Sequence, residues 1–130
     1  MRKEKILLIV LLVASVVSVG GCVVAAVGAG AAGTVAYLKG DMEAVESNKL
    51  DEVHAATLKA VEELGLKVTK VRKDALSAAV VARDAQDKKV TITLSATTEQ
   101  TTKLSIRVGV FGSEAKSRLI YQKIHGHLQK

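Results

Sequence analysis

Apolar residues recur along the chain in two rhythms, and each rhythm predicts one kind of element. From Lys49 to Leu64 they return every three or four positions, which is typical of an amphipathic helix. Asn48 is expected to cap this helix and Gly65 to end it. A second helix is expected after a Ser113 cap. Its apolar stripe consists of Ile120, Tyr121, Ile124 and Leu128.

Between the two helices, apolar and polar residues alternate with period two, which predicts strands. The alternation is clearest over residues 90–95 and 104–110, where Val110 continues the apolar series. Weaker alternation over residues 66–68 and 76–82 predicts two more short strands, and residues 34–40 resemble another. Residues 97–102 are expected to form the last connection. Consecutive strands with short links favour antiparallel pairing.

These elements predict an α+β fold, a two-layer sandwich in which two amphipathic helices cover one face of an antiparallel sheet of four to five strands. The other face remains accessible. It is expected to carry Thr91, Thr93, Ser95, Ser105 and Arg107, with an apolar portion from Val71, Ala79 and Val81. Two interpretations stay open, a solvated sheet face and a partner-binding surface. The second would use Thr91, Thr93, Ser95 and Arg107.

The N-terminal segment has the three parts of a secretory signal, a basic start, an apolar core and small residues before Cys22. The run Val19-Gly20-Gly21-Cys22 resembles the bacterial lipobox, in which the cysteine receives diacylglycerol and becomes the mature N-terminus. The resemblance implies cleavage between Gly21 and Cys22 and lipidation of Cys22, with palmitate as an expected acyl group. The expected division is a signal peptide over 1–21, a lipidated small-residue tether over 22–39 and one domain over 40–130.

An uncleaved transmembrane helix is the main alternative for this segment. No charged residue occurs between Lys5 and Lys39, and a membrane span needs only about 20 apolar residues. Repeated glycines weaken a single helix across the whole stretch, so a break at Gly20-Gly21 is the simpler account. A redox role for Cys22 is disfavoured because the chain has no second cysteine.

The segment Gly28 to Gly33 spells G-x-G-x-x-G, which in a dinucleotide-binding fold cradles a pyrophosphate. That fold needs a strand before the motif and a helix after it, and neither is expected here. A tether of small residues is the preferred interpretation. A nucleotide-phosphate or small-ligand protein that uses this loop is kept as the alternative function.

Charge and composition point to no nucleic acid partner. The net charge is +6, and it falls to about +4 once residues 1–21 are removed. The cations are interspersed with acids, and aromatic residues make up only 2% of the chain, too few for a base-stacking surface. A weak attraction of Lys39 to anionic lipid head groups is plausible.

Candidate chemistry is sparse, so no catalytic residue, metal site, cofactor or small-molecule substrate is predicted, and the chain is not expected to be an enzyme. His54 is interpreted as a surface or half-buried helix residue. His125 and His127 stand two apart and point in different directions on a helix, which disfavours a shared metal. They are expected to belong to a fraying, pH-sensitive tail.

Two blocks of the sequence resemble a family of small bacterial lipoproteins that is defined only as a domain of unknown function. The blocks are GCVVAAVGAGAAGTVAYLKGDMEA and SIRVGVFGSEAKS. The resemblance implies a Gram-negative envelope location and supplies no catalytic residue. Val23 stands where an aspartate would signal retention at the inner membrane. The resemblance therefore implies an outer-membrane protein that faces the periplasm. The expected function is a lipid-anchored binding or structural module that docks another envelope protein.

Overall fold

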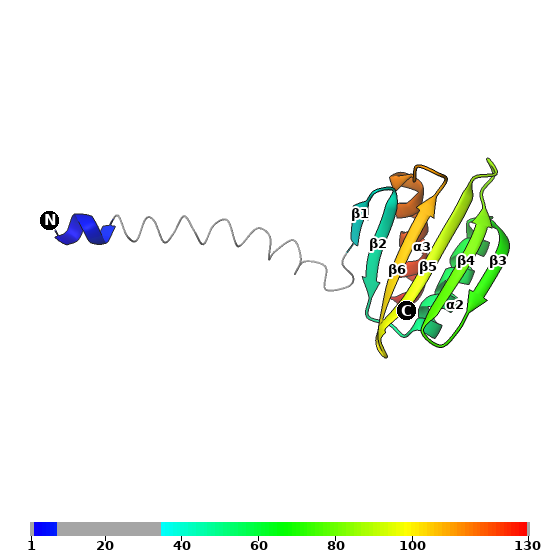
Figure 1. Ribbon diagram of the computed structural model, residues 1–130, viewed down its shortest axis with the longest axis horizontal. Helices are drawn as coiled ribbons and strands as arrows, with labels where there is room; N and C mark the ends of the chain where they lie inside the picture. The colour runs from blue at the N-terminus through cyan, green and yellow to red at the C-terminus, as the bar shows by residue number, and fades with distance from the viewer. Residues whose placement is uncertain (1, 8–34, 130) are drawn as a thin grey trace. The chain divides into compact units, whose positions relative to one another are not determined.

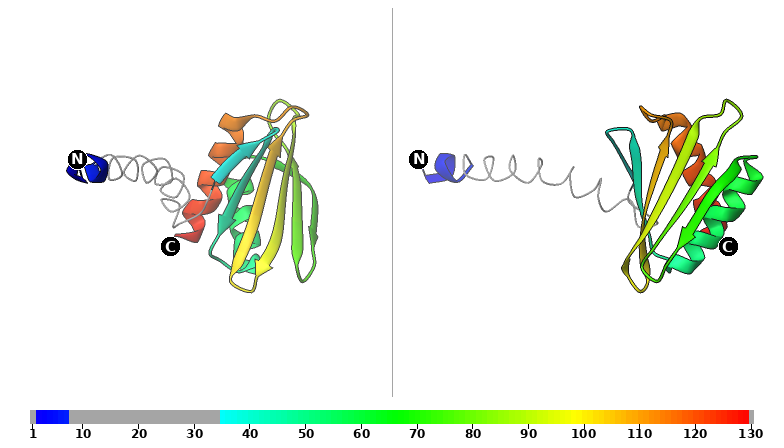
Figure 2. Two further views of the ribbon diagram at one scale, coloured as in Figure 1. Left: turned by 60° about the vertical axis from the view of Figure 1, so that its left-hand side comes forward. Right: turned by 45° about the vertical axis from the view of Figure 1, so that its right-hand side comes forward.

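The computed structural model describes residues 2–7 and 35–129. The chain divides into two units, Met1–Ala31 and Ala32–Lys130. In the first unit, residues 2–7 are helical. The second unit is an α+β fold with one six-stranded antiparallel sheet in the order β1-β2-β6-β5-β4-β3. Helices α2 and α3 both lie on one face of this sheet, and we call the opposite face the outer face (Figure 2).

The central strands are β5 (Lys89–Thr98) and β6 (Thr101–Val108), and their pairing forms the middle of the core. The register places apolar residues directly opposite one another, including Ile92 with Ile106 and Leu94 with Leu104. These four side chains are completely buried beneath the helices. Because successive residues of a strand point to opposite faces, the same register sends the intervening threonines and serines to the outer face.

Helix α2 (Leu50–Glu63) packs Val53, Ala60 and Val61 against the sheet. Its end is a Schellman motif, in which Leu66 donates to the Val61 carbonyl and Gly65 to the Glu62 carbonyl. The predicted Gly65 terminator is therefore confirmed, and its φ of +69° explains the choice of glycine.

The predicted cap of α2 was wrong by one residue. Lys49 occupies the N-cap position, and its backbone N–H donates to the carboxylate of Glu52 at 3.4 Å. Asn48 instead donates its side-chain amide to the same carboxylate.

Helix α3 (Glu114–Leu128) begins where predicted, with the Ser113 hydroxyl accepting from the Lys116 N–H. Its predicted stripe is also confirmed, since Ile120, Tyr121 and Ile124 are buried and Leu128 packs at the margin of the core.

The strand count was too low, because β2 (Asp41–Glu46) was not predicted. This strand joins β1 (Val35–Leu38), which matches the short strand expected near residue 34, to the central strand β6. Its inner positions are Met42, Ala44 and Glu46, all buried. A carboxylate at the third inner position hides the period-two pattern, which explains why the sequence did not indicate a strand here.

Two boundaries near β6 also differ from the prediction. The connection expected over residues 97–102 is only a two-residue turn, because β5 continues to Thr98 and β6 begins at Thr101. Val110 was expected to continue the buried alternation, yet β6 ends at Val108 and the Val110 side chain is 79% exposed.

The far edge of the sheet consists of β3 (Lys67–Lys73), which pairs with β4 (Ser77–Arg83). A bulge at Thr69 shifts the register, so that Val68 lies opposite Ala82 but Lys70 lies opposite Val81. The extra residue reverses the facing of all later side chains. Val71 therefore shares the helix-side face with Val80, and its predicted place on the outer face was wrong. Every residue of β3 is exposed, and its cations discourage pairing with another sheet edge.

In the described ranges, 2–7 and 35–129, no helix combines the length and apolar character needed to cross a membrane. The uncleaved-span alternative concerns residues that lie mostly outside these ranges.

The packing of α3 on the sheet gives the first testable prediction. Ile124 is fully buried, so Ile124→Ala is expected to lower the free energy of unfolding by about 2–5 kcal/mol, through lost apolar burial and a residual cavity. Leu119 is 53% exposed on the same helix, and Leu119→Ala serves as the matched control with a change of about 0.5 kcal/mol or less. Urea unfolding measures both. Equal effects of the two substitutions would contradict the placement of α3.

Candidate functional site

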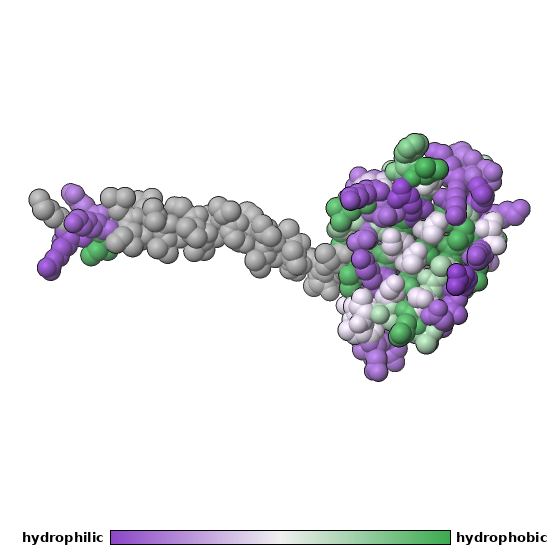
Figure 3. All heavy atoms as spheres, in the orientation of Figure 1, coloured by the Kyte–Doolittle hydropathy of each residue, from purple (hydrophilic) through white to green (hydrophobic). Residues whose placement is uncertain are grey.

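The outer face has a hollow at the end of the sheet where β4 and β6 finish, which is uppermost in Figure 1. We call this the upper end. The hollow has a volume of about 710 Å³ and lies between the β4–β5 turn and the loop that joins β6 to α3. Its charged lining residues are Arg83, Asp87, Lys88, Lys89 and Arg107. Four cations against one carboxylate make the hollow basic, and Figure 3 shows hydrophilic side chains at this end of the face around an apolar group.

The basic character continues across the strands. Lys67 of β3 lies opposite Arg83 of β4, and Arg83 lies opposite Lys89 of β5. Three cations therefore stand in one row across three adjacent strands. Arg83 has a partial counter-charge, since its Nε lies 3.8 Å from the Asp87 carboxylate. Within residues 35–129, Lys67 and Lys89 form no ion pair.

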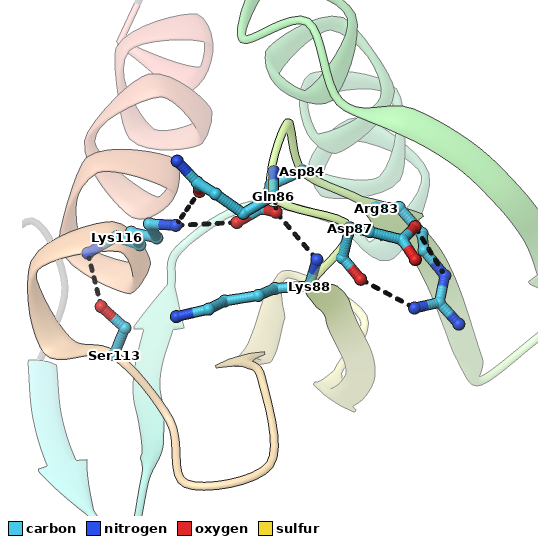
Figure 4. Close-up of polar contacts among 7 residues, drawn as sticks. All are labelled: Arg83, Asp84, Gln86, Asp87, Lys88, Ser113 and Lys116. Carbon is cyan, nitrogen blue, oxygen red and sulfur yellow. Dashed lines mark hydrogen bonds and ion pairs between the residues drawn. The ribbon is translucent and has the colours of Figure 1, made fainter.

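The β4–β5 turn is shaped by Asp84, as Figure 4 shows. One carboxylate oxygen of Asp84 accepts from the N–H groups of Gln86 and Lys88, each at 2.9 Å. The other accepts from Lys116 of α3 at 2.8 Å, and Lys116 also donates to the Gln86 side chain. The turn is thereby fixed to the start of α3. The hydrogen bond from Lys116, followed by that from the Lys88 N–H, lowers the pKa of Asp84.

Arg107 of β6 fixes the other side of the hollow. Its Nη1 donates to the Asp41 carboxylate at 3.0 Å and to the Lys39 carbonyl at 3.1 Å, and its Nη2 donates to the Val110 carbonyl. One guanidinium thus joins the β1–β2 turn to the β6–α3 loop. Charge-assisted contacts of this kind are stronger than neutral hydrogen bonds.

Two glycines allow these two segments to touch. Gly40 and Gly112 both have positive φ, +88° and +81°. A Cβ on Gly112 would lie 2.3 Å from the Gly40 carbonyl oxygen, and one on Gly40 would lie 2.7 Å from the Phe111 carbonyl oxygen. Any larger residue at Gly112 would push the two backbones apart. The close approach leaves Val110 and Phe111 projecting at the rim, with Phe111 92% exposed.

This arrangement can attract and hold an anion by charge. Thr91 and Ser113 also line the hollow. In the part of the chain that the structure describes, no group of three or more histidine, cysteine, aspartate or glutamate side chains is placed to hold a metal ion.

A family model described as "Protein of unknown function (DUF3568)" matches residues 5–127. The chain belongs to this family. The domain-of-unknown-function part of the expected resemblance is thus confirmed, whereas the match says nothing of a lipobox. No curated protein matches the chain.

The structure of this DUF3568 member separates the residues predicted for the partner surface. Thr91 lines the hollow, whereas Thr93 and Ser95 are exposed further down the outer face. Arg107 lies on the same face, but its guanidinium is engaged by Asp41 and two carbonyls, so its first role is to position loops. The lipidation and cleavage residues, Gly21 and Cys22, and the Gly28–Gly33 motif lie outside the described residues.

A second polar cluster lies on the helix side of the sheet and was not anticipated. Glu46 of β2 is 1% exposed and contacts Nδ1 of His125 at 2.9 Å. Tyr121 stacks on His125 one turn away, with ring centroids 5.5 Å apart. Burial raises the pKa of the Tyr121 hydroxyl, and the Glu46 carboxylate raises it further. A buried carboxylate must be hydrogen-bonded or paired with a charge, and this structural requirement accounts for the cluster.

The expected fraying of the C-terminal histidines was wrong. Helix α3 continues to Leu128, and His127 contacts the Glu63 carboxylate of α2 at 3.0 Å, with Lys123 3.6 Å from the same carboxylate. The hydrogen bond from His127 lowers the pKa of Glu63, and Lys123 assists. His125 and His127 do point in different directions, as predicted, and each meets a carboxylate from a different element.

His54 is half-buried on α2, as predicted for a surface or half-buried helix residue. Its Nε2 is buried, and no residue among 2–7 and 35–129 forms a hydrogen bond with it. Burial lowers the pKa of His54, and the nearby Lys73 lowers it further. The lowered pKa favours a neutral imidazole at this position.

The Asp84 contacts predict a pH-dependent stability. Since its pKa is lowered by folding, the ionised carboxylate stabilises the fold above the unfolded-state pKa of about 3.9, and this contribution is lost as the pH falls through the folded-state value. Asp84→Asn is expected to lower the melting temperature at pH 7, with a difference from wild type that shrinks below about pH 4.

Asp87→Asn is the matched control for this experiment. It removes a carboxylate from the same turn, but that side chain is 86% exposed and 3.8 Å from its cation, so the melting temperature should change little at either pH. A pH-independent difference for Asp84→Asn would show that the carboxylate charge does not secure the turn.

Proposed function

We propose that this protein is a lipid-anchored module of the bacterial envelope that docks another envelope component through the outer face of its sheet. Attachment would be through Cys22, at the outer membrane and facing the periplasm. The docking proposal rests on the observation that the helices cover only one face of the sheet. Both α2 and α3 pack on one face, and no element of residues 35–129 covers the other.

The side chains at the middle of the outer face suit a docking surface. Thr93 lies between Ala79 on β4 and Ser105 on β6, so the middle of the face consists of short side chains. Short side chains lose little rotamer freedom when a partner immobilises them, and they let the partner approach the sheet closely. The polar hydroxyls keep such a surface soluble while it is free.

The anchor proposal rests on the run Val19-Gly20-Gly21-Cys22 after a basic and then apolar N-terminal segment. Covalent geometry limits the 12 residues from 23 to 34 to a span of at most about 40 Å. A lipidated Cys22 would therefore hold the domain close to the membrane surface. That distance is compatible with partners in the same membrane or just beneath it.

Intact-mass analysis of the protein extracted from membranes tests the anchor. The expected species begins at Cys22 and carries diacylglycerol and an acyl chain. Cys22→Ser is expected to remove both modifications and leave the N-terminal segment uncleaved. An unmodified wild-type chain that retains residues 1–21 would contradict the lipid anchor and favour an uncleaved membrane span.

Photocrosslinking in living cells tests the docking face. A photoreactive amino acid at Thr93 or Ser95 is expected to give an adduct of defined mass, because both side chains are exposed on the outer face. Glu62, exposed on α2, is the matched control position and should give no such adduct. Adding Ala79→Glu, which places a charge opposite Thr93, should reduce the adduct. Equal yields from Thr93 and Glu62, or none above the unirradiated sample, would overturn the docking proposal.

A further inference from the structure

The row formed by Lys67, Arg83 and Lys89 is unfavourable for the sheet by itself. These cations lie directly opposite one another on three adjacent strands, and like charges in that relation destabilise a sheet. The Asp87 carboxylate lies 3.8 Å from one of the three and is 86% exposed, so its compensation is weak. An external anion would relieve this repulsion.

The bulge at Thr69 enlarges the basic surface. Because of the extra residue, Lys70 lies opposite Val81 and Arg72 opposite Ala79, so both cations belong to the outer face. In an unbroken register they would face the helix side. Neither side chain forms an ion pair within residues 35–129. The local chain geometry thus adds positive charge to a face that already carries an unbalanced row.

The same end of the sheet carries an exposed apolar tip. Val110 and Phe111 are 79% and 92% exposed, and they border the hollow that Lys88 and Lys89 line. The tip is held in place by Arg107 and by the Gly40–Gly112 contact, so its exposure is built into the fold. Phenylalanine next to lysine and arginine is the combination that binds the interface of a membrane, with the ring among the acyl chains and the cations at the phosphates.

From these three features we infer that the upper end docks on an anionic lipid bilayer. Lys88, Lys89 and the neighbouring cations bind the phosphate groups of lipid head groups, and Phe111 with Val110 enters the interface. The inference rests on the proposed function in one respect, because an anchor at Cys22 would keep the domain near the bilayer. The contact itself is made by residues of the folded domain. Docking at the upper end would hold the sheet upright on the membrane and leave its middle free.

Tryptophan fluorescence can report on this contact because the chain contains no tryptophan. The full chain carrying Phe111→Trp is purified from membranes in detergent and reconstituted into vesicles of phosphatidylcholine with or without phosphatidylglycerol. With the anionic lipid, we expect a blue-shifted emission and quenching by lipids brominated on their acyl chains. Leu76→Trp is the matched control, since Leu76 is 70% exposed and precedes β4 at the opposite end of the sheet. Its tryptophan should stay unquenched.

The cations are tested by adding Lys88→Gln and Lys89→Gln to the Phe111→Trp chain. The ratio of docked to undocked domains should fall by about tenfold or more, because each cation near an anionic surface contributes to the binding free energy. Lys49→Gln with Lys59→Gln removes the same charge from exposed residues of the helix side and should leave the quenching unchanged. About 1 M salt should abolish the contact, because the screening length then falls to about 3 Å.

Several results would overturn the inference. Absence of quenching in a chain that co-sediments with the vesicles would refute docking while leaving the Cys22 anchor intact. Equal quenching without phosphatidylglycerol would refute the role of the cations. An emission shift in detergent that grows with protein concentration would assign the tip to a second copy of the chain. A shift caused by inorganic phosphate alone would identify a site for small anions in place of a membrane contact.

Discussion

The pairing of β5 with β6 is the constraint on which the rest of the domain depends. Its register places Ile92, Leu94, Leu104 and Ile106 on one face, where α2 and α3 cover them. A slip by one residue would expose this entire set and bury the hydroxyls of Thr93 and Ser105. The helices therefore have only one face on which to pack. The open outer face follows from the same alternation, so the core and the proposed docking surface have one origin.

The sequence was informative wherever one periodicity persisted over several residues. The two helices and the central strands were predicted because most of their buried positions are apolar, with Thr57, Thr102 and Ser117 as the polar exceptions. Strand β2 was missed because Glu46 occupies a buried position, and its partner His125 lies 79 positions away along the chain. Val71 was misplaced because the bulge at Thr69 changes its facing, and no residue pattern around Thr69 indicates a bulge. Both errors arise from contacts or distortions that a local pattern does not contain.

The basic hollow could not be predicted from local sequence patterns, for a related reason. Its cations are scattered through the sequence among acidic residues, so no run of positive charge marks them. Folding separates the charges, because Arg107 binds Asp41 and Lys116 binds Asp84. Lys67 and Lys89 lie on either side of Arg83, and neither forms an ion pair with any described residue. Net charge says little about a face when the carboxylates are engaged in holding loops. Arg107 shows the opposite case. It was expected to contact a partner, but its guanidinium binds Asp41 and two carbonyls of its own chain.

The contact between Gly40 and Gly112 has a consequence for how this family can vary. Two turns that are 72 positions apart share a single space, in which neither backbone tolerates a side chain from the other. A longer β1–β2 turn would displace the β6–α3 loop, and with it the exposed phenylalanine and the start of α3. The two turns should therefore change together among family members, in length and in glycine content, as though they were one inherited segment. Correlated variation at these positions would reflect the close contact between the two backbones.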